Sequence, residues 1–123
     1  METKRQLSVL ENQLKAQKEA LENKNDEYYI CGGTYTLADI AIFPWYGSLV
    51  LGELYGDAAT FLNVDEDYPH VVAWARRVAA RPGVQRGRIV NRTWGEGVPH
   101  LKERHEAADI DAALAAAEKE TDK

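Results

Sequence analysis

One stretch of this chain constrains the fold more than any other. From Thr36 the sequence runs TLADIAIFPWYGSLVLGEL, a Thr-x-x-Asp pair followed by a long apolar run. Thr36 is expected to be an N-cap whose hydroxyl accepts a hydrogen bond from the backbone N–H of Asp39, while the Asp39 carboxylate reaches back to the Thr36 N–H. This structural capping box predicts that a helix begins here.

The run after the cap is apolar on nearly every side, which is typical of a helix buried all round. Pro44 lies inside the run and has no backbone N–H, so it is expected to bend the helix. Gly47 and Gly52 are expected to let neighbouring backbones approach closely. The segment therefore predicts a buried central helix.

The segments on either side also predict helices. Between Thr3 and about Asn23, leucines recur at spacings of three, four and seven residues, which predicts a surface helix that packs one stripe on a core. A short coiled-coil zipper is the alternative, although it needs about three to four sustained heptads. Pro69 is expected to open a second helix, with Val71 or Val72, Trp74 or Ala75, and Val78 on its inner face. Pro82 can start another short helix.

The chain shows no strand alternation of consequence, so the fold class is all-α. Residues 1–108 are expected to form one helical domain. Residues 109–123 form a charged, alanine-rich tail that has little to bury and is expected to fray.

Composition excludes several classes of function. A formal net charge of −5 argues against binding to nucleic acid, which needs a concentrated basic surface. No apolar run approaches the roughly 20 residues that span a bilayer, so no membrane segment is expected. The histidines lack HxxxH or HExxH spacing, so no metal site is expected. The single cysteine, Cys31, excludes an intrachain disulfide and fits a cytoplasmic location.

No residue is assigned a catalytic role from the residues alone. Cys31 is interpreted as a small packed thiol, and Asp39 as a carboxylate satisfied by backbone N–H groups. Trp45 and Tyr46 follow Pro44 and are candidates for the wall of a ligand pocket, with core packing as the alternative.

A second candidate binding region is locally basic and carries an amide. It consists of Arg86, Arg88, Asn91 and Arg92. Such a cluster suits an anionic ligand such as a carboxylate. The alternative is a solvated helix end followed by a loop.

Three segments, taken in order, resemble a known family. The segment Thr36–Ala41 followed by Pro44-Trp45 resembles the sixth helix of the C-terminal domain of glutathione transferases. YPHVVAWARRVAARPGVQRG matches the helices that follow it in that family. RGRIVNRTWGE and LKERH resemble the bacterial nu-class and related fungal glutathione-dependent disulfide-bond oxidoreductases. The similarity runs from about Glu2 to Asp109.

The resemblance implies a helical bundle of the glutathione transferase C-terminal type, truncated on its N-terminal side. In that family a thioredoxin-like domain binds most of the glutathione and activates its thiol, and its βαβ pattern is missing from this sequence. The helical part supplies the second-substrate wall and part of the dimer interface. By resemblance, Trp45 and Tyr46 would line the second-substrate pocket, and Arg88, Asn91 and Arg92 would lie near the active-site mouth.

The partners implied are a second copy of the chain or a thioredoxin-like partner half. Glutathione is the family's co-substrate, and we expect this chain alone not to bind it tightly. A bundle without one of its helices exposes apolar surface, so the isolated chain is expected to be marginally stable and to self-associate. The alternatives are a non-catalytic helical protein-interaction module and a leucine-stripe oligomerisation protein without a ligand.

Overall fold

The computed structural model describes residues 2–90 and 100–122, and every regular element in this part is a helix. The helices are α1 (Glu2–Ala20), α2 (Leu37–Val50), α3 (Ala58–Phe61), α4 (Val64–Asp67), α5 (Pro69–Ala79), α6 (Pro82–Ile89) and α7 (Ala107–Thr121). The described residues contain no strand, and one isolated bridge joins Tyr29 and Gly32. The all-α prediction is confirmed.

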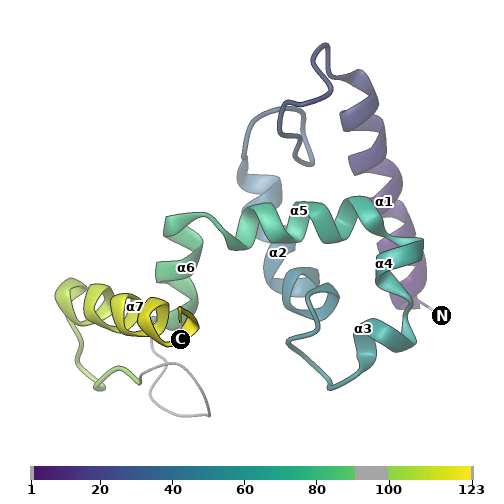
Figure 1. The fold of residues 1–123 in the computed structure, drawn as a ribbon. Coiled ribbons are helices and arrows are strands. Elements are labelled where there is room, and N and C mark those ends of the chain that lie inside the picture. Colours follow the sequence, from purple (N-terminus) through teal and green to yellow (C-terminus); the bar gives the residue numbers. More distant parts are fainter. Residues whose placement is uncertain (1, 91–99, 123) are drawn as a thin grey trace. The chain divides into compact units, whose positions relative to one another are not determined.

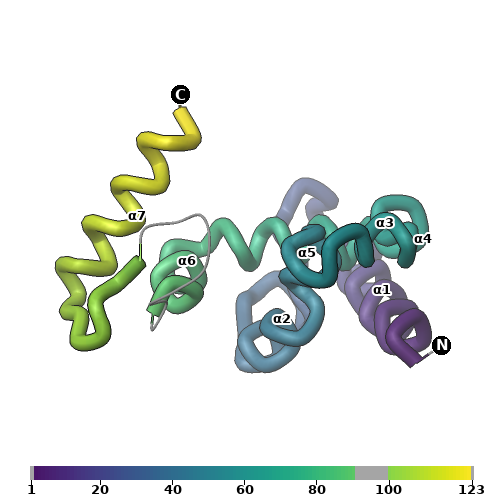
Figure 2. Tube along the Cα trace, turned by 90° about the horizontal axis from the view of Figure 1, so that it is seen from below, coloured from purple at the N-terminus to yellow at the C-terminus, as the bar shows by residue number. Residues whose placement is uncertain are grey.

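The chain divides into two compact units, Met1–Ala79 and Ala80–Lys123, which are described separately. In the first unit α5 packs against both α1 and α2 (Figure 1). Figure 2 shows α1 and α2 lying on the same side of α5. The core of this unit therefore forms where these three helices meet.

The leucine stripe of α1 packs on this core. Leu7 and Leu14 are fully buried and Leu10 is nearly so. Leu21 lies beyond the end of α1 and is half-buried. The stripe thus packs within its own chain, as the surface-helix interpretation predicts.

The inner face of α5 is also as predicted. Where the sequence left a choice between two neighbouring residues, both are buried. The buried residues of α5 are Val71, Val72, Trp74, Ala75 and Val78. Pro69 occupies the first position, where its missing N–H leaves no bond unmade.

The start of α5 is capped by a side chain from another helix. Glu11 of α1 is buried, and its carboxylate accepts from the backbone N–H of His70 at 3.1 Å and of Val71 at 2.9 Å. The Nδ1 atom of His70 lies 2.5 Å from the same carboxylate. The first N–H groups of a helix have no partner within the helix, so Glu11 supplies acceptors that the local sequence does not.

The Thr36–Asp39 pair forms a capping box at the start of α2. Asp39 is fully buried, and its Oδ2 accepts from the Thr36 N–H at 2.9 Å and the Thr36 hydroxyl at 3.3 Å. Its Oδ1 accepts from the indole N–H of Trp74 at 2.8 Å and from the backbone N–H of Ile30 at 3.2 Å. One carboxylate therefore joins α2, α5 and the connector between α1 and α2 (residues 21–36).

The expectation that α2 is buried on every side is wrong. Leu37, Ile40 and Trp45 are 76%, 51% and 77% exposed. The buried face carries Phe43 and Val50 among its apolar residues. The apolar pattern shows what a helix is able to bury, but α1 and α5 contact one side of α2.

Gly47, inside α2, and Gly52, just after its end, do not bring neighbouring backbones together as predicted. A Cβ atom at Gly47 would overlap the ring of Phe43, so Gly47 makes room for a side chain of its own helix rather than for a neighbouring backbone. Gly52 has φ of +75°, a left-handed conformation that glycine adopts readily as the chain leaves the helix.

In the second unit, Pro82 starts the short helix α6, as predicted. A small apolar cluster joins Ile89 to Leu101, Ile110 and Ala113. The α7 helix runs across residues 108 and 109, between which the domain boundary was expected, and that boundary stays a prediction. The residues that were expected to fray are helical as far as Thr121. Burial of Ile110 and Ala113 gives this segment a packing face that its composition does not reveal.

Replacing Glu11 tests the cap on α5. Glu11→Ala leaves the N–H groups of His70 and Val71 without their acceptor, so we expect the free energy of unfolding to fall by about 2 kcal/mol. Urea unfolding followed by circular dichroism measures the change. Glu19→Ala, at an exposed position of the same helix, is the control and should change stability by no more than about 0.5 kcal/mol. Equal effects of the two variants would contradict the capping role.

Replacing Asp39 tests the buried carboxylate. Asp39→Ala leaves the indole N–H of Trp74 and the backbone N–H groups of Ile30 and Thr36 without an acceptor. We therefore expect the free energy of unfolding to fall by about 3 kcal/mol and the melting temperature to be lower. Asp57→Ala is the matched control, because Asp57 is exposed and makes no side-chain cap bond at the start of α3. An unchanged melting temperature for Asp39→Ala would refute the role given to this carboxylate.

The start of α7 has a predicted pH dependence. The backbone N–H of Glu106 donates to the Asp109 carboxylate at 2.8 Å, and this bond, followed by Lys102, lowers the pKa of Asp109 below its ordinary value of 3.8. The capping stabilisation is therefore complete above that value and is lost as the pH falls through the lowered pKa.

The measurement is an NMR titration of the Glu106 amide resonance. We expect a transition with a midpoint below 3.8 that is missing from the Asp109→Asn variant. A midpoint at or above the ordinary value would show that the folded chain does not favour the ionised carboxylate.

Candidate functional site

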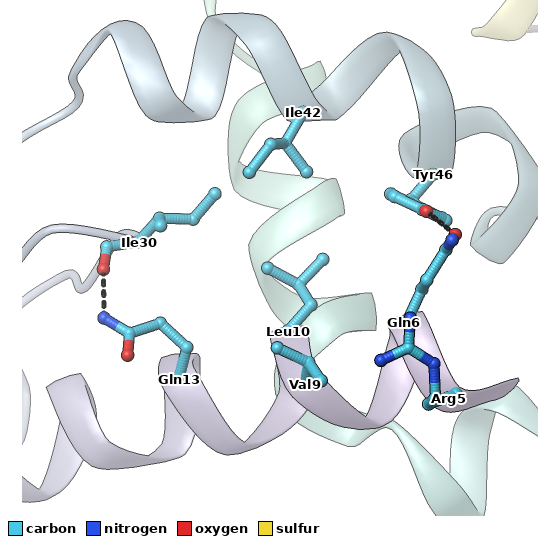
Figure 3. Close-up of a pocket in the computed structure, with 8 residues that line it drawn as sticks. All are labelled: Arg5, Gln6, Val9, Leu10, Gln13, Ile30, Ile42 and Tyr46. Atoms are coloured by element: carbon cyan, nitrogen blue, oxygen red, sulfur yellow. Dashed lines mark hydrogen bonds between the residues drawn. The ribbon is translucent and has the colours of Figure 1, made fainter. Parts of the chain in front are cut away.

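A pocket of about 330 Å³ lies between α1 and α2 in the first unit. Its lining residues, shown in Figure 3, are Arg5, Gln6, Val9, Leu10, Gln13, Ile30, Ile42 and Tyr46. They come from α1, from α2 and from the connector. The pocket therefore depends on the way the connector returns the chain alongside α1.

The middle of the pocket is apolar. Leu10 points from α1 toward Ile42 of α2, with Val9 beside it (Figure 3). Val9 is 61% exposed whereas Leu10 is nearly buried, so the apolar surface continues from the core out to solvent. A surface of this kind favours an apolar group of a ligand or a partner.

Polar pairs lie on either side of this apolar surface. The Tyr46 hydroxyl donates to the side-chain oxygen of Gln6, joining α2 to α1. The side-chain amide of Gln13 donates to the carbonyl oxygen of Ile30 at 2.7 Å. These bonds fix the spacing of α1, α2 and the connector around the pocket.

Arg5 contributes a cation at the mouth of the pocket. Its guanidinium lies 2.6 Å from the Glu2 carboxylate, which raises the pKa of Arg5 and, together with Gln6, lowers the pKa of Glu2. Both side chains are well exposed, so solvent screens the pair and it adds little stability. An anionic ligand group would have to compete with Glu2 for Arg5.

The side chains that line the pocket are suited to binding a ligand by apolar contact and hydrogen bonds. Its side chains offer alkyl surface, two amides, a guanidinium and a phenol. None of these eight residues carries a thiol, an imidazole or a carboxylate. The pocket can hold an apolar group and bond to polar atoms beside it, and the Tyr46 phenol is the one lining side chain that can take part in acid–base or nucleophilic chemistry.

The predicted binding residues belong to both compact units of the chain. Tyr46 lines the pocket, but the adjacent Trp45 is not among the lining residues. Arg88 lies on α6 in the second unit and is exposed. Asn91 and Arg92 lie outside the described residues. The roles given to these residues by resemblance stay predictions.

The lining residues of α1 were not predicted, although their spacing holds a signal. Gln6, Val9 and Gln13 recur every three to four residues immediately beside the buried leucine stripe. An exposed valine between two amides at that spacing marks the edge of a helix face that is not fully solvated.

Other candidate chemistry was also located. Cys31 is exposed rather than packed, because the connector turns back at Gly32, which has φ of +106°. Within residues 2–90 and 100–122, no three histidine, cysteine or acidic side chains cluster so as to hold a metal ion. No helix in this part of the chain is long and apolar enough to cross a membrane.

Comparisons with known proteins agree with the helical arrangement. Residues 1–82 match the family model described as the glutathione S-transferase C-terminal domain. The disulfide-bond oxidoreductase YghU of Escherichia coli is 48% identical over 111 residues, which is 90% of this chain and 34% of that protein. An uncharacterised GST-like protein of Streptococcus mutans is 43% identical over 86 residues, covering 70% of this chain and 28% of that protein.

A solved structure is similar as well. The glutathione transferase YghU from Streptococcus pneumoniae, complexed with glutathione, shares 45% identity with a TM-score of 0.59. The match covers 71% of this chain and 29% of that one. The chain thus spans about a third of the length of these relatives. The matched domain, the identity and the shared fold show that the chain belongs to the glutathione S-transferase family through its C-terminal domain.

Proposed function

We propose that this chain is the helical second-substrate and dimerisation part of a glutathione-dependent disulfide-bond oxidoreductase. The observation that carries the proposal is the 48% identity to a disulfide-bond oxidoreductase over nine-tenths of the chain. Glutathione would be the co-substrate, since a related structure is complexed with it. The single cysteine fits action in the cytoplasm.

The proposal assigns the chemical step to a thioredoxin-like partner half. The pocket between α1 and α2 supplies apolar surface and hydrogen-bonding groups, and its lining carries no histidine, cysteine or carboxylate. The chain would therefore be inactive alone and would shape the site for the second substrate. Tyr46 would contribute to that wall, with Trp45, Arg88, Asn91 and Arg92 as the further candidates by resemblance.

A non-catalytic helical interaction module is the second candidate function. The observation that favours it is the apolar surface on α2, where Leu37 and Trp45 are more than three-quarters exposed. Surface of this kind is used for binding other proteins. The two candidates differ in whether the chain takes part in a disulfide reduction.

Calorimetry with glutathione and with glutathione disulfide tests whether glutathione binding belongs to the partner half rather than to this chain. We expect no measurable heat of binding to the chain alone, because the groups that bind most of the glutathione are assigned to the partner half. Micromolar binding by the chain alone would overturn that assignment.

Adding the part of the Escherichia coli relative that this chain does not match tests the activity. We expect the mixture to reduce a disulfide substrate, and Tyr46→Leu in the chain to raise KM about tenfold with kcat unchanged, as loss of uniform binding predicts. Phe61→Leu is the control, because Phe61 is 72% exposed and is not among the residues that line the pocket. A stable but inactive mixture would favour the interaction module.

A further inference from the structure

One acid–base pair inside the first unit has no part in the proposed site. The side chains of Glu11 on α1 and His70 on α5 contact each other and are only 11% and 22% exposed. Neither residue lines the pocket between α1 and α2. Because the two residues lie 59 positions apart in the sequence, this Glu11–His70 pair forms only when α5 packs against α1.

The contacts of Glu11 fix where the His70 ring carries its proton. The Glu11 carboxylate accepts from the backbone N–H of His70 through Oε1 and from the backbone N–H of Val71 through Oε2. The His70 Nδ1 atom lies 2.5 Å from the same Oε1 atom. An ionised carboxylate can only accept hydrogen bonds, so Nδ1 must be the nitrogen that carries the N–H.

The other ring nitrogen of His70 is therefore the one that can gain or lose a proton. Within the described chain, its Nε2 atom makes no hydrogen bond. Among the described residues, Nε of Arg77 is the one buried side-chain nitrogen or oxygen atom without a partner, so Nε2 of His70 reaches solvent. Water can deliver a proton to Nε2 while Nδ1 stays bonded to Glu11.

Three helices contribute the charged groups around α5, and they leave Glu11 as the partner of His70. Of the charged residues of α1, only Glu11 is buried. Asp39 is the one charged residue of α2, and its oxygens are bonded to the Trp74 indole and to the connector. The acidic residues of α4, which precedes α5, are all exposed, and they are Asp65, Glu66 and Asp67.

The connector contributes an aromatic ring rather than a charge. The ring centroids of Tyr28 and His70 are 6.1 Å apart. Two cations lie over the Tyr28 ring, with the Arg77 guanidinium 4.1 Å and the Lys18 ammonium 5.9 Å from its centroid. Within the described chain, Glu11 is thus the one charged side chain in direct contact with the His70 ring.

The start of α5 acts against a cation on His70, but Glu11 outweighs it. A helix N-terminus carries roughly half of a positive elementary charge, spread over its first N–H groups. Glu11 brings a full negative charge within hydrogen-bonding distance of both those N–H groups and the ring. The net field at His70 therefore favours the imidazolium form, because solvent screens a largely buried pair only weakly.

We infer that the Glu11–His70 pair is a proton-linked contact that holds α5 on α1 more strongly in mild acid than in mild alkali. Proton uptake at Nε2 converts a neutral hydrogen bond into an imidazolium–carboxylate ion pair, which is the stronger of the two. The added stability is present while histidine is charged and is lost as the pH rises through the range of about 5 to 8 in which histidine ordinarily titrates. This inference does not rest on the proposed function.

NMR of the His70 ring nitrogens is the first test. At about pH 8 we expect the neutral ring to carry its proton on Nδ1, as a ¹⁵N–¹H long-range correlation spectrum reports directly. Glu11→Gln removes the anion that selects this tautomer, and we expect the spectrum to move toward the Nε2–H form. His70→Asn identifies the His70 resonances by their loss.

The pH dependence of unfolding is the second test. Between about pH 8 and pH 6, we expect the urea midpoint of the wild-type chain to rise by about 0.5 M relative to His70→Asn. Asn keeps an N–H donor for Glu11 but cannot gain a charge, so this variant separates the hydrogen bond from the ion pair. Contributions from His100 and His105 are common to both chains and cancel in the difference.

Two results would overturn the inference. One is a neutral His70 ring that carries its proton on Nε2 in the wild-type chain. The other is a midpoint that rises no more in the wild type than in His70→Asn. The NMR result is read on the unmodified chain, so it decides the matter even when a variant folds poorly. Neither readout measures glutathione binding or disulfide reduction, so the contact and the proposed activity can fail independently.

Discussion

The first unit depends on one buried carboxylate. Asp39 receives hydrogen bonds from the start of its own helix, from the Ile30 backbone and from the Trp74 indole, and it has no access to solvent. A buried charge is tolerated only when such bonds replace the water it has lost. Because the two oxygen atoms of this α2 residue accept from donors on the connector and on α5, the register of all three segments is fixed at once. Apolar packing alone would allow these elements to slide.

The aromatic contacts extend this arrangement. The rings of Phe43 and Trp74 meet edge to face with centroids 6.0 Å apart, and Gly47 leaves the space that the Phe43 ring occupies. On the following turn of α5, Arg77 donates to the carbonyl oxygen of Tyr28 at 2.9 Å and lies over its ring. The inner face of α5 thus combines apolar burial with polar bonds to the connector. Between α1 and α2 the same fold leaves a pocket whose position is set by the connector.

Much of the fold followed from local patterns. The cap at Thr36, the start of α5 at Pro69 and the leucine stripe of α1 depend on residues close together in the sequence. Glu11 could not be assigned to α5 from the sequence, because its partners lie 59 and 60 residues away and a glutamate on a solvated helix face has the same local pattern. The exposure of α2 was missed because periodicity does not reveal which neighbours are present. Of the candidate site, Tyr46 lines the pocket but Trp45 does not, since adjacent residues point about 100° apart around a helix.

The cap supplied by Glu11 has a consequence for the order of assembly. A ribosome makes about 5–20 residues per second, so several seconds separate the synthesis of Glu11 from that of Val71. During that interval the leucine stripe of α1 lacks the α5 surface on which it packs, and afterwards the first N–H groups of α5 gain the Glu11 acceptors only by docking on α1. The two helices must therefore form and pack together, which makes the nascent chain vulnerable to misassociation until α5 has left the ribosome.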